Sequence, residues 1–152
     1  MPENLSHIDA EGRASMVDVS TKPSMRRTAT AACFFIANAQ TLDAVMSGNL
    51  PKGEALSVAR IAGIQAAKSC STLIPLCHPL PLEYASVEFE RVAPNQLQIT
   101  AKTVVTGKTG IEMEALTAVS VAALTLWDMT KAIDKELTID SIRLLEKKKE
   151  NN

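Results

Sequence analysis

Alternating apolar and polar residues in the middle of the chain predict a β-hairpin. Over 84–92, Val87 and Phe89 face one way and the glutamates beside them face the other, as in a half-buried strand. Pro-Asn at 94–95 supplies the turn, and 97–105 returns as the partner strand. A strand is predicted at 25–36, where β-branched and aromatic residues gather toward the far end, and a last strand is predicted at 137–145.

Helical periodicity predicts two longer helices, at 54–70 and 110–133. The first carries small residues at helical spacing, which allow another backbone to approach closely: Ala55, Ala59, Gly63 and Ala66. A shorter helix is predicted at 39–46, because Asn38 can cap its start and Gly48 can end it.

The order of these elements predicts an α+β fold. It is the split β-α-β, ferredoxin-like order: an antiparallel sheet with two long helices on one face, plus a short extra helix. We expect a single domain over 1–152, with an N-terminal arm at 1–24 and a charged, frayed tail at 146–152. Alternation at 16–19 suits a short strand or an ordered arm. The uncovered sheet face predicts an oligomer.

Composition narrows the class of function. The 152 residues are 46% hydrophobic and 22% charged, as in an ordinary globular protein. Only 3% are aromatic and the net charge is −1, which argues against a nucleic-acid partner. An apolar leader and any run of bilayer length are missing, so we expect no membrane partner. Three cysteines without paired spacing predict reduced thiols and a cytoplasmic protein.

The turn at 106–110, Thr-Gly-Lys-Thr-Gly, resembles the end of a phosphate-binding P-loop. A true P-loop needs a glycine five positions before Gly107, where this chain has Lys102. We therefore reject a nucleotide-hydrolysing P-loop. A weaker property survives, because a polar turn that enters a helix offers free N–H groups and a lysine to an anion.

Two glutamates follow this turn at the start of the long helix. Thr109 and Glu112 fit the T-x-x-E capping box, so we assign Glu112 to helix capping. Glu114 is left unused by that box and is the better functional candidate.

Asp128 and Lys131 lie near the other end of the same helix, at i and i+3, and so are neighbours on its surface. A surface ion pair is the ordinary interpretation. The position of the pair beside Trp127, the only tryptophan, favours function. Asp128 lies about 21 Å from Glu114 along the helix, at ~1.5 Å per residue. Either the substrate is elongated, or two copies of the helix contribute opposite ends to each site.

Cys77 and His78 lie between two prolines in an extended segment. Adjacent residues there point to opposite sides, so a zinc site is poorly supported. The segment either presents one imidazole from a rigid wall or carries a structural cysteine and a solvent-facing histidine, and the residues alone leave both open. Lys52 precedes a helix; it is either solvated or an acid/base group with a lowered pKa.

Four longer motifs carry a family resemblance. They are Met-Val-Asp-Val-Ser at 16–20, Ala-Arg-Ile-Ala-Gly-Ile-Gln-Ala-Ala-Lys at 59–68, Leu-Ile-Pro-Leu-Cys-His-Pro-Leu at 73–80, and Thr-Gly-Lys-Thr-Gly-Ile-Glu-Met-Glu-Ala-Leu-Thr at 106–117. In this order they closely resemble the cyclic pyranopterin monophosphate synthases, the C proteins of molybdenum-cofactor biosynthesis. The resemblance implies a homo-hexamer, a trimer of dimers, with sites at subunit interfaces. It also implies a small-molecule substrate, a cyclised dihydro-GTP intermediate, which rearranges to cyclic pyranopterin monophosphate and releases pyrophosphate.

The resemblance also implies roles for individual residues. It assigns catalysis to Asp128, Lys131 and Lys52. It assigns substrate contact to Leu76, Cys77, His78, Met113 and Glu114, with weaker support for Arg27 and Lys68 as phosphate partners. No cofactor is firmly implied, and Mg²⁺ accompanying the phosphates stays open.

Two other classes of protein fit the same residues. One is a non-catalytic oligomeric module that binds a nucleotide or anion through the turn at 106–110, and the other is a purely structural oligomer. The first binds ligand without releasing pyrophosphate, and the second binds no ligand.

Overall fold

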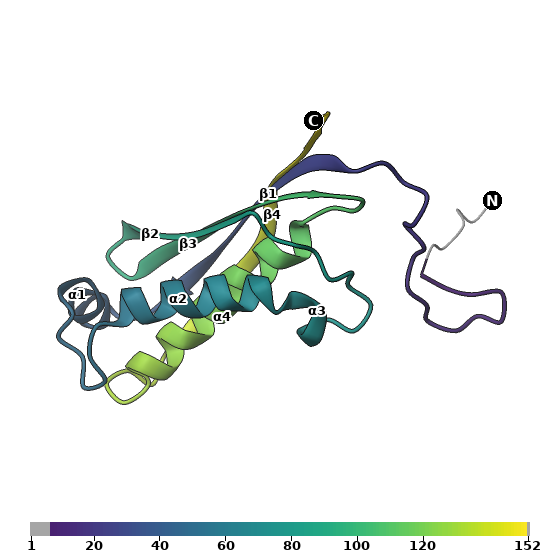
Figure 1. Ribbon diagram of the computed structural model, residues 1–152. Helices are drawn as coiled ribbons and strands as arrows, with labels where there is room; N and C mark the ends of the chain where they lie inside the picture. The colour runs from purple at the N-terminus through teal and green to yellow at the C-terminus, as the bar shows by residue number, and fades with distance from the viewer. Residues whose placement is uncertain (1–6, 152) are drawn as a thin grey trace.

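Helices pack on one face of a four-stranded antiparallel sheet (Figure 1). The computed structural model describes residues 7–151. In chain order its elements are β1 (Met25–Ile36), α1 (Ala39–Ser47), α2 (Ala55–Lys68), α3 (Cys70–Leu73), β2 (Tyr84–Ala93), β3 (Gln96–Gly107), α4 (Glu112–Thr130) and β4 (Thr138–Glu150). This arrangement confirms the predicted α+β fold.

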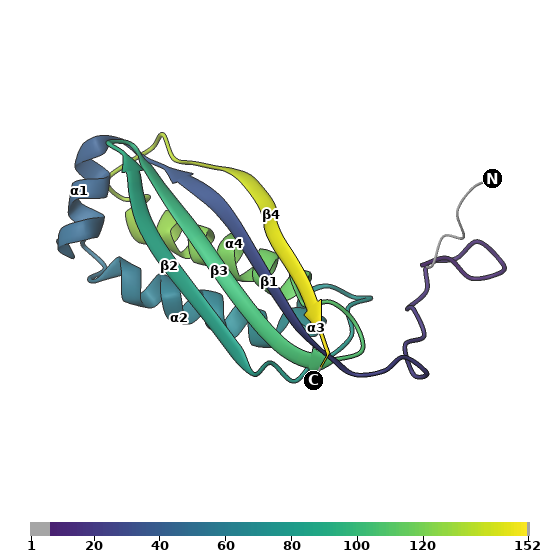
Figure 2. The same cartoon turned by 90° about the horizontal axis from the view of Figure 1, so that it is seen from above.

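The sheet has the strand order β2-β3-β1-β4 (Figure 2). The predicted hairpin is present, since β2 pairs with β3 from Tyr84–Val104 to Ala93–Gln96. β1 lies between β3 and β4 and is hydrogen-bonded to both. Half of the twelve residues of β1 are buried, including an unbroken run at 31–33.

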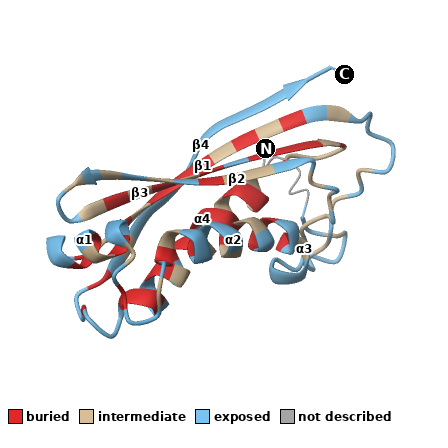
Figure 3. Ribbon diagram, turned by 60° about the vertical axis from the view of Figure 1, so that its left-hand side comes forward, coloured by how far each residue is buried: buried red, intermediate tan, exposed pale blue. Residues whose placement is uncertain are grey.

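The core lies between the inner sheet face and the α2–α4 layer (Figure 3). Its largest fully buried side chains include Phe35, Leu97 and Ile99 from the sheet and Leu126 from α4. Where α2 crosses α4, a Cβ on Gly63 would lie 2.9 Å from the carbonyl oxygen of Ala118. The predicted close approach along the small-residue face of α2 is therefore confirmed.

Local capping sets the bounds of α1 as predicted. The Asn38 side chain accepts a hydrogen bond from the Thr41 amide, and Gly48 ends the helix in the left-handed region at φ 77°. The helix predicted at 54–70 is instead two helices, because α2 ends at Lys68 and Ser69 joins it to the single turn α3. At the other end of α2, the Glu54 carboxylate caps the amides of Leu56 and Ser57.

The predicted frayed tail was wrong over 146–150. β4 continues to Glu150 and pairs with β1 up to Arg26, so the charged residues form strand rather than tail. Their backbone is stabilised by a partner strand from the far end of the chain, which composition cannot reveal. Residue 152 lies outside the described residues.

The N-terminal arm is ordered from residue 7, and residues 1–6 lie outside the described part of the chain. Residues 16–19 are extended but belong to no strand, so the arm alternative is the correct one. Ile8 and Ala14 form an isolated bridge within it. Among the described residues, no helix is both long and apolar enough to cross a bilayer.

Candidate active site

The candidate residues gather at opposite ends of α4. Met113 and Glu114 lie in its first turn, Asp128 lies near its last turn, and Lys131 is its C-cap residue. The helix between them is packed along its length, with alanines at 115, 118, 122 and 123 fully buried. Because α4 is a continuous, tightly packed helix, it keeps the two groups of residues at a fixed separation.

Two lysines bind one carboxylate at the C-terminal end of α4. Nζ of Lys52 lies 3.0 Å from Oδ2 of Asp128, and Nζ of Lys131 lies 3.0 Å from Oδ1. Hydrogen bonds and charge from Lys131 and then Lys52 lower the pKa of the Asp128 carboxyl. All three side chains are about half exposed. The pairing of Asp128 with Lys131 predicted from their spacing is confirmed.

Lys52 reaches this cluster from the loop between α1 and α2. Leu50 in that loop is buried in the core, and its carbonyl oxygen accepts the amide of Gly53 at 3.0 Å. Gly53 has φ 100°, a backbone conformation that glycine adopts readily and other residues rarely adopt. The loop is therefore a fixed turn that projects Lys52 toward α4.

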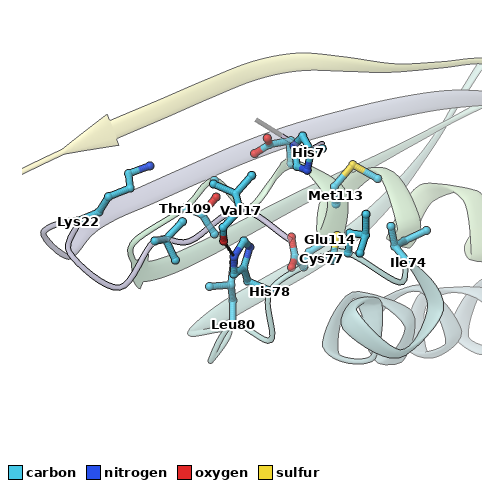
Figure 4. Close-up of a pocket in the computed structure, with 14 residues that line it drawn as sticks. His7, Val17, Lys22, Ile74, Cys77, His78, Leu80, Thr109, Met113 and Glu114 are labelled. Atoms are coloured by element: carbon cyan, nitrogen blue, oxygen red, sulfur yellow. Dashed lines mark hydrogen bonds between the residues drawn. The ribbon is translucent and has the colours of Figure 1, made fainter. Parts of the chain in front are cut away.

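A cavity of about 360 Å³ lies at the N-terminal end of α4 (Figure 4). Five of the seven predicted substrate-contacting residues line it: Leu76, Cys77, His78, Met113 and Glu114. The arm contributes four more lining side chains, those of His7, Val17, Val19 and Lys22. The structure thus joins the arm, the proline-rich segment and the start of α4 around one space.

His78 is held by the arm. Its Nε2 lies 2.6 Å from the carbonyl oxygen of Val17. A carbonyl only accepts hydrogen bonds, so Nε2 carries the proton and Nδ1 is an acceptor in the neutral ring. The imidazole is therefore oriented by the same segment that closes the cavity.

Glu114 is the buried carboxyl of this cavity. Its side chain is 4% exposed, and its Oε2 has no hydrogen-bond partner among the described residues. Burial, with a smaller contribution from Glu112, raises the pKa of the Glu114 carboxyl. A buried acceptor without a partner is costly, so it marks a position where a ligand donor would be stabilised.

The predicted capping box was wrong. α4 begins after Ile111, which makes no side-chain capping bond, so Thr109 lies too early to cap the helix. The Glu112 carboxylate turns instead to β4, where Nζ of Lys147 lies 3.2 Å away. A tertiary ion pair replaces the local bond that the sequence pattern suggested.

Cys77 does not provide a nucleophile at neutral pH. Burial, with the neighbouring Cys70 thiol, raises the pKa of Cys77 to about 12. Cys33, Cys70 and Cys77 are all free thiols. Within residues 7–151, no group of three or more His, Cys, Asp or Glu side chains could hold a metal ion.

A second, basic cavity of about 400 Å³ adjoins the first, because Lys22, Thr109 and Gly110 line both. Its cationic lining comes from the arm, β1 and β4: Lys22, Arg27, Lys147, Lys148 and Lys149. Arg27 is 7% exposed, and its Nε donates to the carbonyl oxygen of Gly107 at 3.2 Å. Sequence reasoning found Arg27 but missed the four lysines, since it placed three of them in a frayed tail.

Four of the predicted site residues line neither the cavity that contains Glu114 nor the basic cavity. The C-terminal cluster of Lys52, Asp128 and Lys131 does not line the cavity that contains Glu114. Lys68, exposed in the last turn of α2, lines none of the cavities described here. One copy of the chain therefore does not unite all candidate residues in one space.

Proteins with similar sequences share one name. A cyclic pyranopterin monophosphate synthase of Desulfitobacterium hafniense is 55% identical over 143 residues, covering 94% of this chain and 88% of the relative. Synthases of the same name from Novosphingobium aromaticivorans and Chloroflexus aggregans are each 54% identical, covering 95% and 96% of this chain and 92% and 89% of the relatives. The sequence model of the MoaC family matches residues 16–150, and the chain belongs to the MoaC family.

Proposed function

We propose that this protein is a cyclic pyranopterin monophosphate synthase, a lyase of molybdenum-cofactor biosynthesis. It converts a cyclised dihydro-GTP intermediate into cyclic pyranopterin monophosphate and releases pyrophosphate. The observation that carries the proposal is the pairing of Lys52 and Lys131 on Asp128, at 3.0 Å each, in a chain of the MoaC family.

The two lysines perform the proton transfers. Opening one ring and closing another requires a group that takes a proton and a group that gives one, and an amine serves for either. Asp128 accepts hydrogen bonds from both Nζ atoms and holds the two amines close together. As substrate displaces one of these contacts, that lysine becomes free to exchange a proton with the reacting atoms.

The basic cavity receives the phosphates. Its cations, with Arg27 fixed by its bond to the Gly107 carbonyl, match the charge of a triphosphate. An intramolecular hydroxyl gives its proton to whichever of Lys52 and Lys131 is neutral and attacks the innermost phosphorus. The new P–O bond closes the cyclic phosphate as the bond to the departing pyrophosphate breaks. The lysines of the basic cavity stabilise the negative charge that builds up on the departing pyrophosphate.

The neighbouring cavity holds the ring system. Glu114 offers an unpartnered oxygen to ring N–H donors, and His78 is oriented at the opposite wall by Val17. Leu76 and Met113 supply apolar contact for a planar ring. The two cavities are contiguous, so ring and phosphates of one elongated molecule fit across them.

Each complete site takes residues from two copies of the chain. The Lys52–Asp128–Lys131 cluster is half exposed and lines neither the Glu114 cavity nor the basic cavity of its own chain, whereas lysine acid/base chemistry benefits from a desolvated site. Large apolar side chains exposed on the helices provide contact area for partners: Val58, Ile61, Leu124 and Trp127. The assembly we propose is a hexamer, a trimer of dimers.

Any Mg²⁺ in the reaction would be held chiefly by the substrate's phosphates, because residues 7–151 contain no cluster of three metal ligands. The free thiols and the GTP-derived substrate favour a cytoplasmic location.

The test is to incubate the purified protein with the authentic cyclised GTP intermediate and to measure pyrophosphate and the cyclic product. We expect Lys52→Ala and Lys131→Ala each to lower kcat by about 10²–10⁴-fold, the usual contribution of general acid–base catalysis. Lys102→Ala, an exposed lysine of β3, is the matched control and should keep wild-type turnover. Binding without pyrophosphate release would support the non-catalytic module instead.

Subunit sharing has its own test. Inactive Asp128→Asn and inactive Glu114→Ala proteins are mixed under conditions where subunits exchange. If each site takes its lysine cluster from one copy and its cavity from another, mixed oligomers regain part of the activity. Proven exchange with no recovery would count against shared sites.

A further inference from the structure

A second aspartate, just after the end of α4, is buried and accepts three hydrogen bonds. Asp134 is 3% exposed. Its Oδ2 accepts from the amide of Asn38 at 2.9 Å and from Oγ1 of Thr41 at 3.0 Å, and its Oδ1 accepts from the amide of Glu136 at 2.9 Å. Whereas Asp128 meets lysines at the surface, Asp134 holds backbone and hydroxyl donors in the interior.

These bonds join the two segments that carry the lysine cluster. On one side, the amide of Asp134 donates to the carbonyl oxygen of Thr130, in the turn that contains Lys131. On the other side, Asn38 is the N-cap of α1, and α1 leads through Gly48 into the loop of Lys52. Besides the direct contacts at Asp128, a second path from Lys131 to Lys52 through the main chain and hydrogen bonds therefore passes through the Asp134 carboxylate.

We propose that Asp134 is a positioning residue that sets the placement of Lys52 relative to Asp128 and Lys131. The proposal rests on the function proposed above. Without the carboxylate, the Asn38 amide loses its acceptor, and the Thr41 hydroxyl keeps only Oδ1 of Asn38 at 2.8 Å, an acceptor within α1's own cap. The start of α1 is then released from the end of α4. A shift of about 1 Å at a catalytic group costs about 10²-fold in rate, so this anchor affects turnover as well as stability.

The test compares Asp134→Asn, Asp134→Ala and Thr41→Val with the wild type in the pyrophosphate-release assay. We expect Asp134→Ala to lower kcat about 10–100-fold with KM changed less than about threefold, since the carboxylate is buried and bonded to the protein's own donors. Asp134→Asn keeps one oxygen acceptor and should recover part of the loss. Thr41→Val removes a single donor and should show a smaller loss of the same kind.

Two controls separate positioning from simple destabilisation. Asp43→Asn removes the charge from a different anchor of α1, the 2.6 Å ion pair with Arg91 on the exposed side, and should leave kcat within about twofold. Val119→Ala, a fully buried position in α4, supplies a destabilised variant whose unfolding midpoint can be compared with that of Asp134→Ala. Its kcat should stay near the wild-type value at temperatures where it is folded.

A readout without substrate completes the test. Trp127, the only tryptophan, lies beside Asp128 and is 38% exposed, so its emission and its quenching by acrylamide report on this end of α4. We expect both to change in the Asp134 variants and not in Asp43→Asn. If Asp134→Ala does not fold, Asp134→Asn and Thr41→Val carry the comparison.

The outcomes for the two proposals are distinct. Wild-type protein that releases no pyrophosphate would overturn the proposed function, while the Trp127 signal would still show whether Asp134 fixes the end of α4. Turnover of folded Asp134 variants within twofold of wild type would overturn the positioning role. So would an equal loss of kcat in Val119→Ala at matched stability.

Discussion

Replacing Gly63 by alanine tests how closely α2 and α4 approach each other. The new Cβ would lie 2.9 Å from the carbonyl oxygen of Ala118, 2.9 Å from Cγ2 of Val87 and 3.3 Å from Cβ of Ala122. The first contact is with the main chain of a helix, which cannot rotate away. The second is with a side chain that can move only within a filled core.

The expected size of the effect is a difference between two terms. Alanine improves helix propensity over glycine by about 1 kcal/mol. Overpacking a filled core costs about 1–3 kcal/mol, and the rigid carbonyl of Ala118 places this case in the upper part of that range. We therefore expect Gly63→Ala to lower the free energy of unfolding by about 1–2 kcal/mol, or the melting temperature by about 2–8 °C.

Urea unfolding followed by circular dichroism measures the change. A matched pair, Gln65→Ala and Gln65→Gly, measures helix propensity alone at an exposed position of the same helix. In a double-mutant cycle, Val87→Ala should reduce the cost of Gly63→Ala because it removes one of the two close contacts. If Gly63→Ala is more stable than wild type by as much as Gln65→Ala is more stable than Gln65→Gly, the close approach of the helices is refuted.

Three further changes test other features. Ser141 has φ 55°, in the left-handed region, so Ser141→Gly should relieve strain at the cost of glycine's larger backbone entropy in the unfolded chain. We expect a net gain of about 0.5–1 kcal/mol in the free energy of unfolding, measured in urea. A loss of stability would show that Ser141 is not strained. Because the pKa of Cys33 and of Cys77 is raised to about 12, both remain thiols at pH 8, and iodoacetamide should label them only after unfolding. Rapid labelling of the folded protein, detected by mass spectrometry, would contradict this. Lys147→Met should raise KM for the cyclised GTP intermediate several-fold by removing a cation of the basic cavity, and an unchanged KM would place the phosphates elsewhere.

Local signals were predictable because their chemistry lies within a few residues. The cap of α1 needs only the Asn38 side chain and the Thr41 amide, and its end needs only Gly48. Asp128 and Lys131 meet because helical geometry places i and i+3 side by side, and the 3.0 Å bond is where that spacing predicts it.

Features that depend on distant partners were not predictable. The charged run at 146–150 becomes strand because β1 supplies hydrogen bonds along its edge, and the lysines of the basic cavity were missed with it. Glu112 likewise forms an ion pair with Lys147 of β4, and the predicted capping bond is not made, because the distant strand β4 lies beside the start of α4. The approach of Lys52 to Asp128 depends on how α1 is anchored, and no sequence periodicity records that anchor.

The position of β1 between β3 and β4 has a consequence for synthesis on the ribosome. β4 is the last strand to be translated, and until it emerges β1 has one open edge with unpaired amides and carbonyls. A nascent chain can form the β2–β3 hairpin and pair β3 with β1, but it cannot complete the sheet. Shortening the chain before residue 146 would leave that edge exposed for strand-to-strand aggregation, and it would also remove three of the cavity's lysines. Completion of the sheet and assembly of the basic cavity are thus a single late event.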